Sequence, residues 1–289
     1  MKFKGKEEIL VKKIIGLMLV IFLLFFVSGC VKQNPPTQEP QPDKDLSNDD
    51  LNNIWETVEN NGTSFGLYTI ALSANLGFFS VSKPVPSNLI EKLPTAKSVD
   101  KLTIEANWQG PDADGWYTQT SDNSYVKVRY YSSLKKLEFK SESTVGGVTT
   151  GESGSLIFNK NIRVETEGAY PVSGSVSLYY FTPFENDPNK MNKFGFTLSF
   201  SNVGITYLSQ FNNIGILTGN MSLYVTLINY DSNINVNNKL MASFTSQVQG
   251  ADSDDPVLVM SGSKDKDGDP TTDDGDDNFE LNLHLADVL

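Results

Sequence analysis

The chain has 289 residues, of which 39% are hydrophobic and 20% are charged, and its formal net charge at pH 7 is −12. This acidic balance argues against binding to nucleic acids and against lying on anionic lipid surfaces. The single cysteine has no partner for a disulfide within the chain, and the single histidine leaves the usual catalytic triads of hydrolases without support.

The first residues have the pattern of a secretory signal peptide. Five lysines lie among residues 2–13, an apolar run covers residues 14–27, and the small pair Ser28-Gly29 follows it. The apolar run is shorter than the ~20 residues that a membrane-spanning helix needs. We therefore expect residues 1–29 to be removed by cleavage.

The only cysteine follows this run directly. The sequence Val27-Ser28-Gly29-Cys30 resembles the lipobox of bacterial lipoproteins, in which an invariant cysteine receives a diacylglyceryl group. The resemblance implies that Cys30 is a lipid attachment point, whose palmitate-type acyl chains hold the protein on a membrane. An ordinary signal peptide or a short anchor helix, with a chance cysteine, is the alternative. The resemblance also implies an extracytoplasmic location, and Val31 favours the outer membrane if the cell has one.

A polar, proline-rich stretch comes next. Residues 31–46 contain four prolines and three glutamines, a composition that does not bury a core. We expect residues 30–46 to form a lipidated tether and residues 47–289 to form a single β-rich domain. Without residues 1–29 the chain has 18 basic and 33 acidic side chains, a net charge of −15.

The domain is expected to open with a helix. Ser47 and Asp50 resemble a capping box, and Gly62 supplies a stop signal. Residues 65–81 are apolar on most sides, which favours a second helix over a pair of buried strands. The apolar stripe of the first helix consists of Leu51, Ile54, Trp55 and Val58.

From residue 101 onward, apolar and polar residues alternate, as in antiparallel strands with one buried face. The alternation is clearest in residues 101–108, 136–143, 194–201, 221–229 and 279–288. Polar, glycine-bearing or Asn/Asp-rich turns are expected at 110–115, 120–124, 145–154 and 230–233.

These patterns predict a mainly β fold. We expect one large antiparallel curved sheet, a half-barrel or barrel of about ten strands, with one or two N-terminal helices. A sheet of this size must curl, close or split into two layers. In outline it resembles the half-barrel of periplasmic lipoprotein carriers of the LolA/LolB type, while a closed barrel and a two-sheet sandwich remain open.

An acidic segment near the C-terminus suggests a calcium site. Residues 252–280 contain eleven acidic residues and two lysines. Residues 263–274 are similar to the calcium loops of EF-hands and thrombospondin type 3 repeats, although Pro270 and the terminal aspartate depart from the pattern. A solvated acidic hairpin loop is the alternative. The candidate ligands are Ser263, Asp265, Asp267, Asp269 and Asp274.

Two further features bear on binding. His284 is expected on the polar face of its strand, as a surface residue. The aromatic runs at 116–117, 130–131 and 179–181 should each direct one ring away from the core face. Such rings can stack on sugars or anchor a partner protein, or they can pair with neighbouring strands.

We expect no enzymatic activity, because the sequence contains no phosphate loop, dinucleotide fingerprint or zinc spacing. The leading expectation is a lipid-anchored cell-envelope binding protein for a hydrophobic ligand or a lipoprotein. The alternative is a structural or adhesive surface lipoprotein, stabilised by calcium, that binds a protein or a glycan. The expected partners are the membrane, through the lipid on Cys30, and such a ligand or envelope protein.

Overall fold

The computed structural model describes residues 39–58, 108–165, 169–211, 214–265 and 276–287. Residues 40–289 form a compact unit distinct from the preceding chain, and that unit is described below. The predictions for Gly62 and for residues 65–81 and 101–107 lie outside the described residues.

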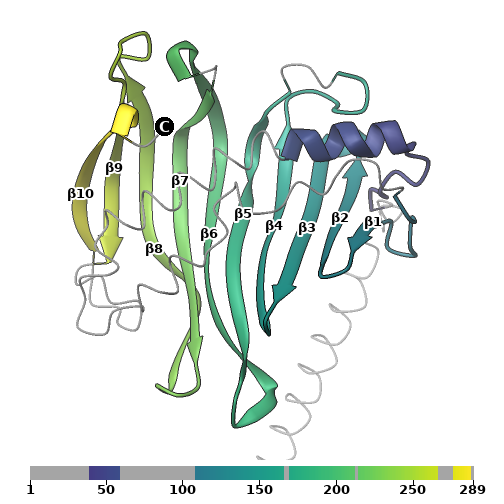
Figure 1. Ribbon diagram of the computed structural model, residues 1–289. Coiled ribbons are helices and arrows are strands. Elements are labelled where there is room, and N and C mark those ends of the chain that lie inside the picture. Colours follow the sequence, from purple (N-terminus) through teal and green to yellow (C-terminus); the bar gives the residue numbers. More distant parts are fainter. Residues whose placement is uncertain (1–38, 59–107, 166–168, 212–213, 266–275, 288–289) are drawn as a thin grey trace, which may run out of the picture. The chain divides into compact units, whose positions relative to one another are not determined.

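Ten antiparallel strands form one sheet, in which each strand pairs with the next along the chain (Figure 1). β1 and β10 lie at opposite edges and do not pair with each other, so the sheet is open. The predicted mainly β fold is therefore confirmed. The strands are β1 Tyr117–Ser121, β2 Ser124–Tyr131, β3 Lys136–Val145, β4 Val148–Phe158, β5 Pro171–Phe184, β6 Asp187–Leu208, β7 Ile214–Asn229, β8 Ile234–Gln249, β9 Val257–Asp265 and β10 Asp276–His284.

Alternation along the strands builds the core, as predicted. In β6, Phe194, Phe196, Leu198 and Phe200 are at most 4% exposed, and the residues between Phe196 and Phe200 face the other side of the sheet. Burial of each such side chain contributes about 1.5–3 kcal/mol. The predicted core positions in β3 and β7 are also buried: Leu137, Phe139, Met221, Leu223 and Val225.

A helix over residues 48–58 packs on the core face of the sheet. The predicted capping box is present, because the Ser47 backbone N–H donates to the Asp50 carboxylate at 2.9 Å and the Asp50 N–H donates to Ser47 Oγ at 3.2 Å. All four residues of the predicted apolar stripe are buried, and the Trp55 ring meets the Phe139 ring edge-on at 6.4 Å. Among the described helices, none is long and apolar enough to span a membrane.

The folded unit begins before residue 47, which corrects the predicted end of the tether. The Asp43 N–H donates to the Tyr130 carbonyl oxygen at 2.7 Å, and the Asp43 carboxylate accepts from the Ser132 hydroxyl at 2.8 Å. The Leu46 N–H donates to the Tyr117 hydroxyl at 3.1 Å. These bonds join residues 43–46 to β1 and to the end of β2, so this part of the proline-rich stretch belongs to the domain.

The predicted turn at 145–154 is shorter than expected. Only Gly146 and Gly147, with φ angles of 59° and 78°, turn the chain, and residues from Val148 onward lie in β4. Gly154 serves close packing, because a Cβ there would lie 2.5 Å from the Phe139 ring. At the other end of the sheet, Leu285 is buried in a short 3-10 helix and not in the predicted last strand. The short 3-10 helices are η1 Ser132–Leu134, η2 Ser209–Phe211 and η3 Leu285–Asp287.

Candidate binding site

The sheet face opposite the core carries rows of small hydroxyl side chains. The strand register aligns one serine from each of six successive strands, β4 to β9, and we call this set the serine row. A second polar row runs beside it from β5 to β9, with Ser173, Ser201, Asn220, Thr245 and Ser261. The serine row consists of Ser155, Ser175, Ser199, Ser222, Ser243 and Ser263.

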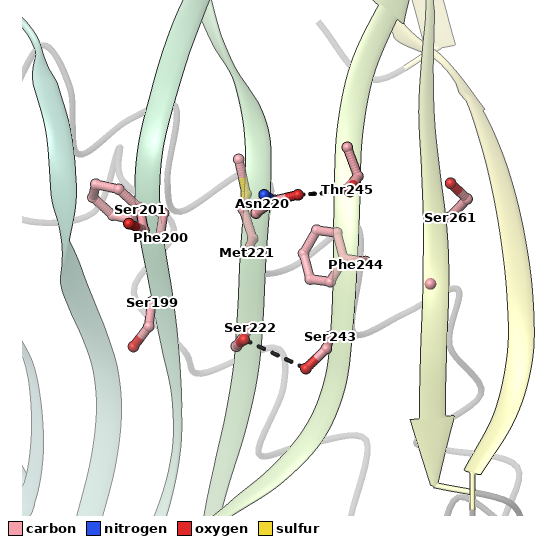
Figure 2. Close-up of a pocket in the computed structure, with 11 residues that line it drawn as sticks. Ser199, Phe200, Ser201, Asn220, Met221, Ser222, Ser243, Phe244, Thr245 and Ser261 are labelled. Atoms are coloured by element: carbon pink, nitrogen blue, oxygen red, sulfur yellow. Dashed lines mark hydrogen bonds between the residues drawn. The ribbon is translucent and has the colours of Figure 1, made fainter.

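A shallow pocket of about 470 Å³ lies where the two polar rows cross β6 to β9 (Figure 2). Its lining also includes Phe200, Met221 and Phe244, but these side chains are only 3–5% exposed and belong to the core. A ligand in the pocket would therefore meet small hydroxyl and amide side chains together with exposed carbon atoms between their polar groups. The polar lining consists of Ser199, Ser201, Asn220, Ser222, Ser243, Thr245 and Ser261.

The pocket is polar without being charged. None of its lining residues is acidic or basic. The Thr245 hydroxyl donates to Asn220 Oδ1 at 2.8 Å, and the hydroxyls of Ser222 and Ser243 lie 3.5 Å apart (Figure 2). Each hydroxyl can both donate and accept, and the Asn220 amide adds two N–H donors. The arrangement suits a ligand with many uncharged hydroxyl groups.

An apolar pair borders the polar rows on the same face. Tyr224 lies two residues from Ser222 along β7, so both side chains point to the same side of the sheet. Its register partner on β8 is Leu240, which is 44% exposed. A half-buried tyrosine ring beside hydroxyl groups offers an apolar platform with a polar surround.

Closer to β1, a half-buried carboxylate organises the same face. Glu142 on β3 accepts hydrogen bonds from the Tyr125 hydroxyl and, at 2.8 Å, from the Tyr179 hydroxyl. Lys140 forms an ion pair with it at 3.0 Å. Tyr179 reaches Glu142 across Gly151, where a Cβ would lie 2.8 Å from the tyrosine ring.

These contacts set the charge state of Glu142. Burial on its own would raise the pKa of its carboxyl group, but the hydrogen bonds from the two tyrosines and Lys140 outweigh burial. The pKa of Glu142 therefore lies below its ordinary value of 4.5. Burial and the hydrogen bond to Glu142 raise the pKa of Tyr179, so this phenol stays protonated at neutral pH. The cluster is internally satisfied, and we assign it a structural role.

We expect Glu142→Gln to lower the free energy of unfolding by about 1.5–3 kcal/mol at pH 7, because it weakens hydrogen bonds to a charged acceptor. Because the pKa of Glu142 is lower in the folded than in the unfolded chain, its ionised carboxylate stabilises the fold at pH values above the ordinary carboxyl pKa. This contribution to stability is lost as the pH falls through the lowered pKa. The difference from wild type should thus shrink at pH 3. Urea unfolding at pH 7 and pH 3 checks this prediction, and Glu185→Gln in an exposed turn is the control. If wild type and Glu142→Gln differ in unfolding free energy as much at pH 3 as at pH 7, the prediction is wrong.

The predicted lipid and metal sites lie largely outside the described residues. Cys30, Asp267, Asp269 and Asp274 are among the residues not described. Ser263 belongs to the serine row, and Asp265, at the end of β9, pairs in register with Asp276 of β10, so the acidic loop connects a β-hairpin. In the described part of the chain, no group of three or more His, Cys, Asp or Glu residues could hold a metal ion. Calcium binding by this loop stays a prediction.

The structure places the other predicted surface residues clearly. His284 is exposed, and its Nδ1 lies 2.7 Å from an Asp255 carboxylate oxygen. In the two strand runs, alternate rings turn from the core face. Two of these rings, Tyr131 and Tyr179, are nevertheless only 9% and 7% exposed. The Tyr179 ring stacks on Phe181 with centroids 5.8 Å apart. Cross-strand and same-face packing therefore explains these two runs.

The serine row was not found from the sequence. Its members come from six strands, and no local motif links them. Serines at the polar positions of the alternating segments, as in residues 199–201, were the only available signal. No model of a protein family matches the chain, and neither does any curated protein or any solved structure.

Proposed function

We propose that this protein is a cell-envelope binding protein that holds an uncharged, polyhydroxylated ligand, a neutral glycan, on the polar face of its sheet. The pocket over β6 to β9 carries the proposal, because it combines seven hydroxyl or amide side chains with no charged residue. Sugar hydroxyls both donate and accept hydrogen bonds, as serine, threonine and asparagine side chains do. The protein needs no catalytic group for this role.

The pocket supports a glycan better than an acyl chain. An acyl chain laid in the pocket would cover seven hydroxyl or amide side chains without forming hydrogen bonds to them, which costs free energy. A sugar ring has polar edges and an apolar C–H face. The hydroxyl rows can bond to the edges, and Tyr224 can contact the apolar face. The geometry thus favours the adhesive, glycan-binding alternative over the hydrophobic carrier.

The serine row extends beyond the pocket, which supports an extended ligand. Six strands at a spacing of ~4.8 Å span roughly 24 Å, long enough for an oligosaccharide of several residues. An open, shallow site gives each sugar unit little burial, so affinity for short fragments should be weak, on the order of a millimolar to micromolar Kd. Tighter binding should appear as the glycan lengthens.

The test is binding of an array of neutral oligosaccharides, followed by calorimetry on any hit. The full-length chain would be purified in a polyoxyethylene detergent, which carries no sugar. We expect Ser243→Tyr, at the centre of the pocket, to fill it and weaken binding at least tenfold. Ser175→Tyr is the matched control for glycans short enough to occupy the pocket alone, because Ser175 is equally half-buried in the serine row but lies outside the pocket. With longer glycans that follow the row, Ser175→Tyr should also weaken binding. Equal binding of the short glycans by both variants, or no binding to any neutral glycan, contradicts the proposal.

We also propose that a lipid on Cys30 anchors the protein on a membrane outside the cytoplasm, and on the outer membrane if the cell has one. The lipobox-like sequence at 27–30 supports this, and the acidic domain would be held close to the surface without adhering to anionic lipids. Cells grown with a clickable palmitate analogue should yield labelled protein, and Cys30→Ala should yield none. Equal labelling of the variant argues against attachment at this residue.

A further inference from the structure

The two edges of the sheet differ in how they are protected. β1 has five residues, and beside it the Gln109 and Thr118 backbones exchange hydrogen bonds of 2.8 and 2.7 Å. β10 has nine residues, and β9 is its only neighbour among the described strands (Figure 1). Exposed strand edges carry unpaired N–H and C=O groups, and proteins usually blunt them.

Among the described residues, β10 lacks several of the usual devices that prevent strand addition, and its charged side chains are acidic. Its sequence contains no proline, no lysine and no glycine. Its register with β9 runs without a bulge from the Asp276–Asp265 pair to the His284–Val257 pair. A long, regular edge that no described segment pairs with on its outer side is a template for another strand.

The side chains of β10 alternate in the way that strand addition requires. Phe279, Leu281 and Leu283 are half-buried and pack against the edge of the core. The residues between them, such as Glu280 and Asn282, are exposed on the polar face. An added strand with apolar residues at every second position would extend the core on one face and remain polar on the other.

We propose that β10 binds an extended, basic segment of a partner protein as an eleventh strand. The charge of β10 and of the adjoining sequence determines the choice of partner, because β10 contains Asp276, Asp277 and Glu280, and residues 252–280 contain eleven acidic residues and two lysines in all. Pairing β10 with β10 of a second copy would bring two such segments together, and their repulsion disfavours it. A strand that alternates lysine or arginine with apolar residues fits both the charge and the pattern.

The probe is an acetylated, amidated nine-residue peptide of alternating lysine and valine. We expect it to bind the full-length chain in nonionic detergent and to slow hydrogen exchange of β10 backbone amides, without protecting those of β5. A glutamate–valine peptide should not bind. A lysine peptide with proline at alternate valine positions should bind at least tenfold more weakly, because proline removes backbone donors. Binding without β10 protection, or equal binding of the proline peptide, would overturn the proposal.

A pair of lysine variants separates edge pairing from general charge attraction. Asn282 and Gln247 share one register line across β10, β9 and β8, and both are exposed. Asn282→Lys places a positive charge on the edge and should weaken binding about fivefold. Gln247→Lys adds the same charge ~10 Å inside the edge, about one Debye length away, and should change binding less than twofold. Equal effects of the two variants, or edge-to-edge dimers of the chain itself, would contradict the inference.

Discussion

Replacing Trp55 with alanine should lower the free energy of unfolding by about 3–5 kcal/mol. Trp55 is 4% exposed and lies on the helix face that packs against the sheet. Its ring contacts Phe139 edge-on at 6.4 Å, so the substitution removes this aromatic contact and leaves a cavity beneath the helix. The neighbouring side chains are held by the strands of the sheet and can relax only partly into the space.

Urea unfolding followed by circular dichroism measures this effect. The matched control is Glu56→Ala, which changes the adjacent, exposed residue of the same helix and should shift stability by less than about 0.5 kcal/mol. If Trp55→Ala cost less than 1 kcal/mol, the helix would contribute little to the folded unit.

Replacing Gly262 with alanine should cost about 3 kcal/mol or more. A Cβ at this position would lie 2.0 Å from the Ser243 carbonyl oxygen and 2.6 Å from the Phe244 Cα. Both are backbone atoms of β8, so β9 would have to move away from its neighbour. Because Gly262 also lines the pocket, the movement should weaken glycan binding together with stability.

The control for this substitution is Gly204→Ala. Gly204 also lies in a strand, but a Cβ there would lie 3.4 Å from the Thr218 hydroxyl oxygen, an ordinary van der Waals contact. Neither glycine has a positive φ, so the two substitutions differ mainly in steric contact. Thermal unfolding of both variants provides the comparison. Equal stability of the two variants would show that the β8–β9 spacing is not fixed by Gly262.

Local signals in the sequence predicted much of the fold. The capping box at Ser47 and the apolar stripe around Trp55 depend on spacings of three and four residues, and both are confirmed. The alternation in residues 194–201 likewise predicted which side of β6 is buried. Such signals depend only on residues close together in the sequence, so they can be recognised in one amino-acid sequence without an alignment.

The candidate site depends on information that is not local. The register of β7 with β8 contains two irregularities, between Leu223 and Tyr224 and between Val225 and Leu227. A shift of one residue in the pairing moves side chains to the opposite face of the sheet. The serine row, which includes Ser222, Ser243 and Ser263, therefore forms only if these irregularities occur where they do. No pattern within a single strand specifies that alignment.

The start of the domain was missed for a related reason. Residues 40–46 have the composition of a linker, with two prolines and several charged side chains. Their partners are remote, since Asp43 bonds to Ser132, 89 positions along the chain. Pairings of this kind arise from tertiary structure and leave no signal in local composition.

The central claim is that the polar sheet face binds an uncharged glycan. Native mass spectrometry of the full-length chain, released from detergent in the presence of a panel of neutral oligosaccharides, tests it most directly because it weighs whatever is bound. We predict one saturable adduct with the mass of a short glycan that the pocket alone can hold, lost in Ser243→Tyr and kept in Ser175→Tyr. A stoichiometric acyl lipid bound in addition to the anchor, with no sugar adduct, would contradict the account and favour a carrier of hydrophobic ligands.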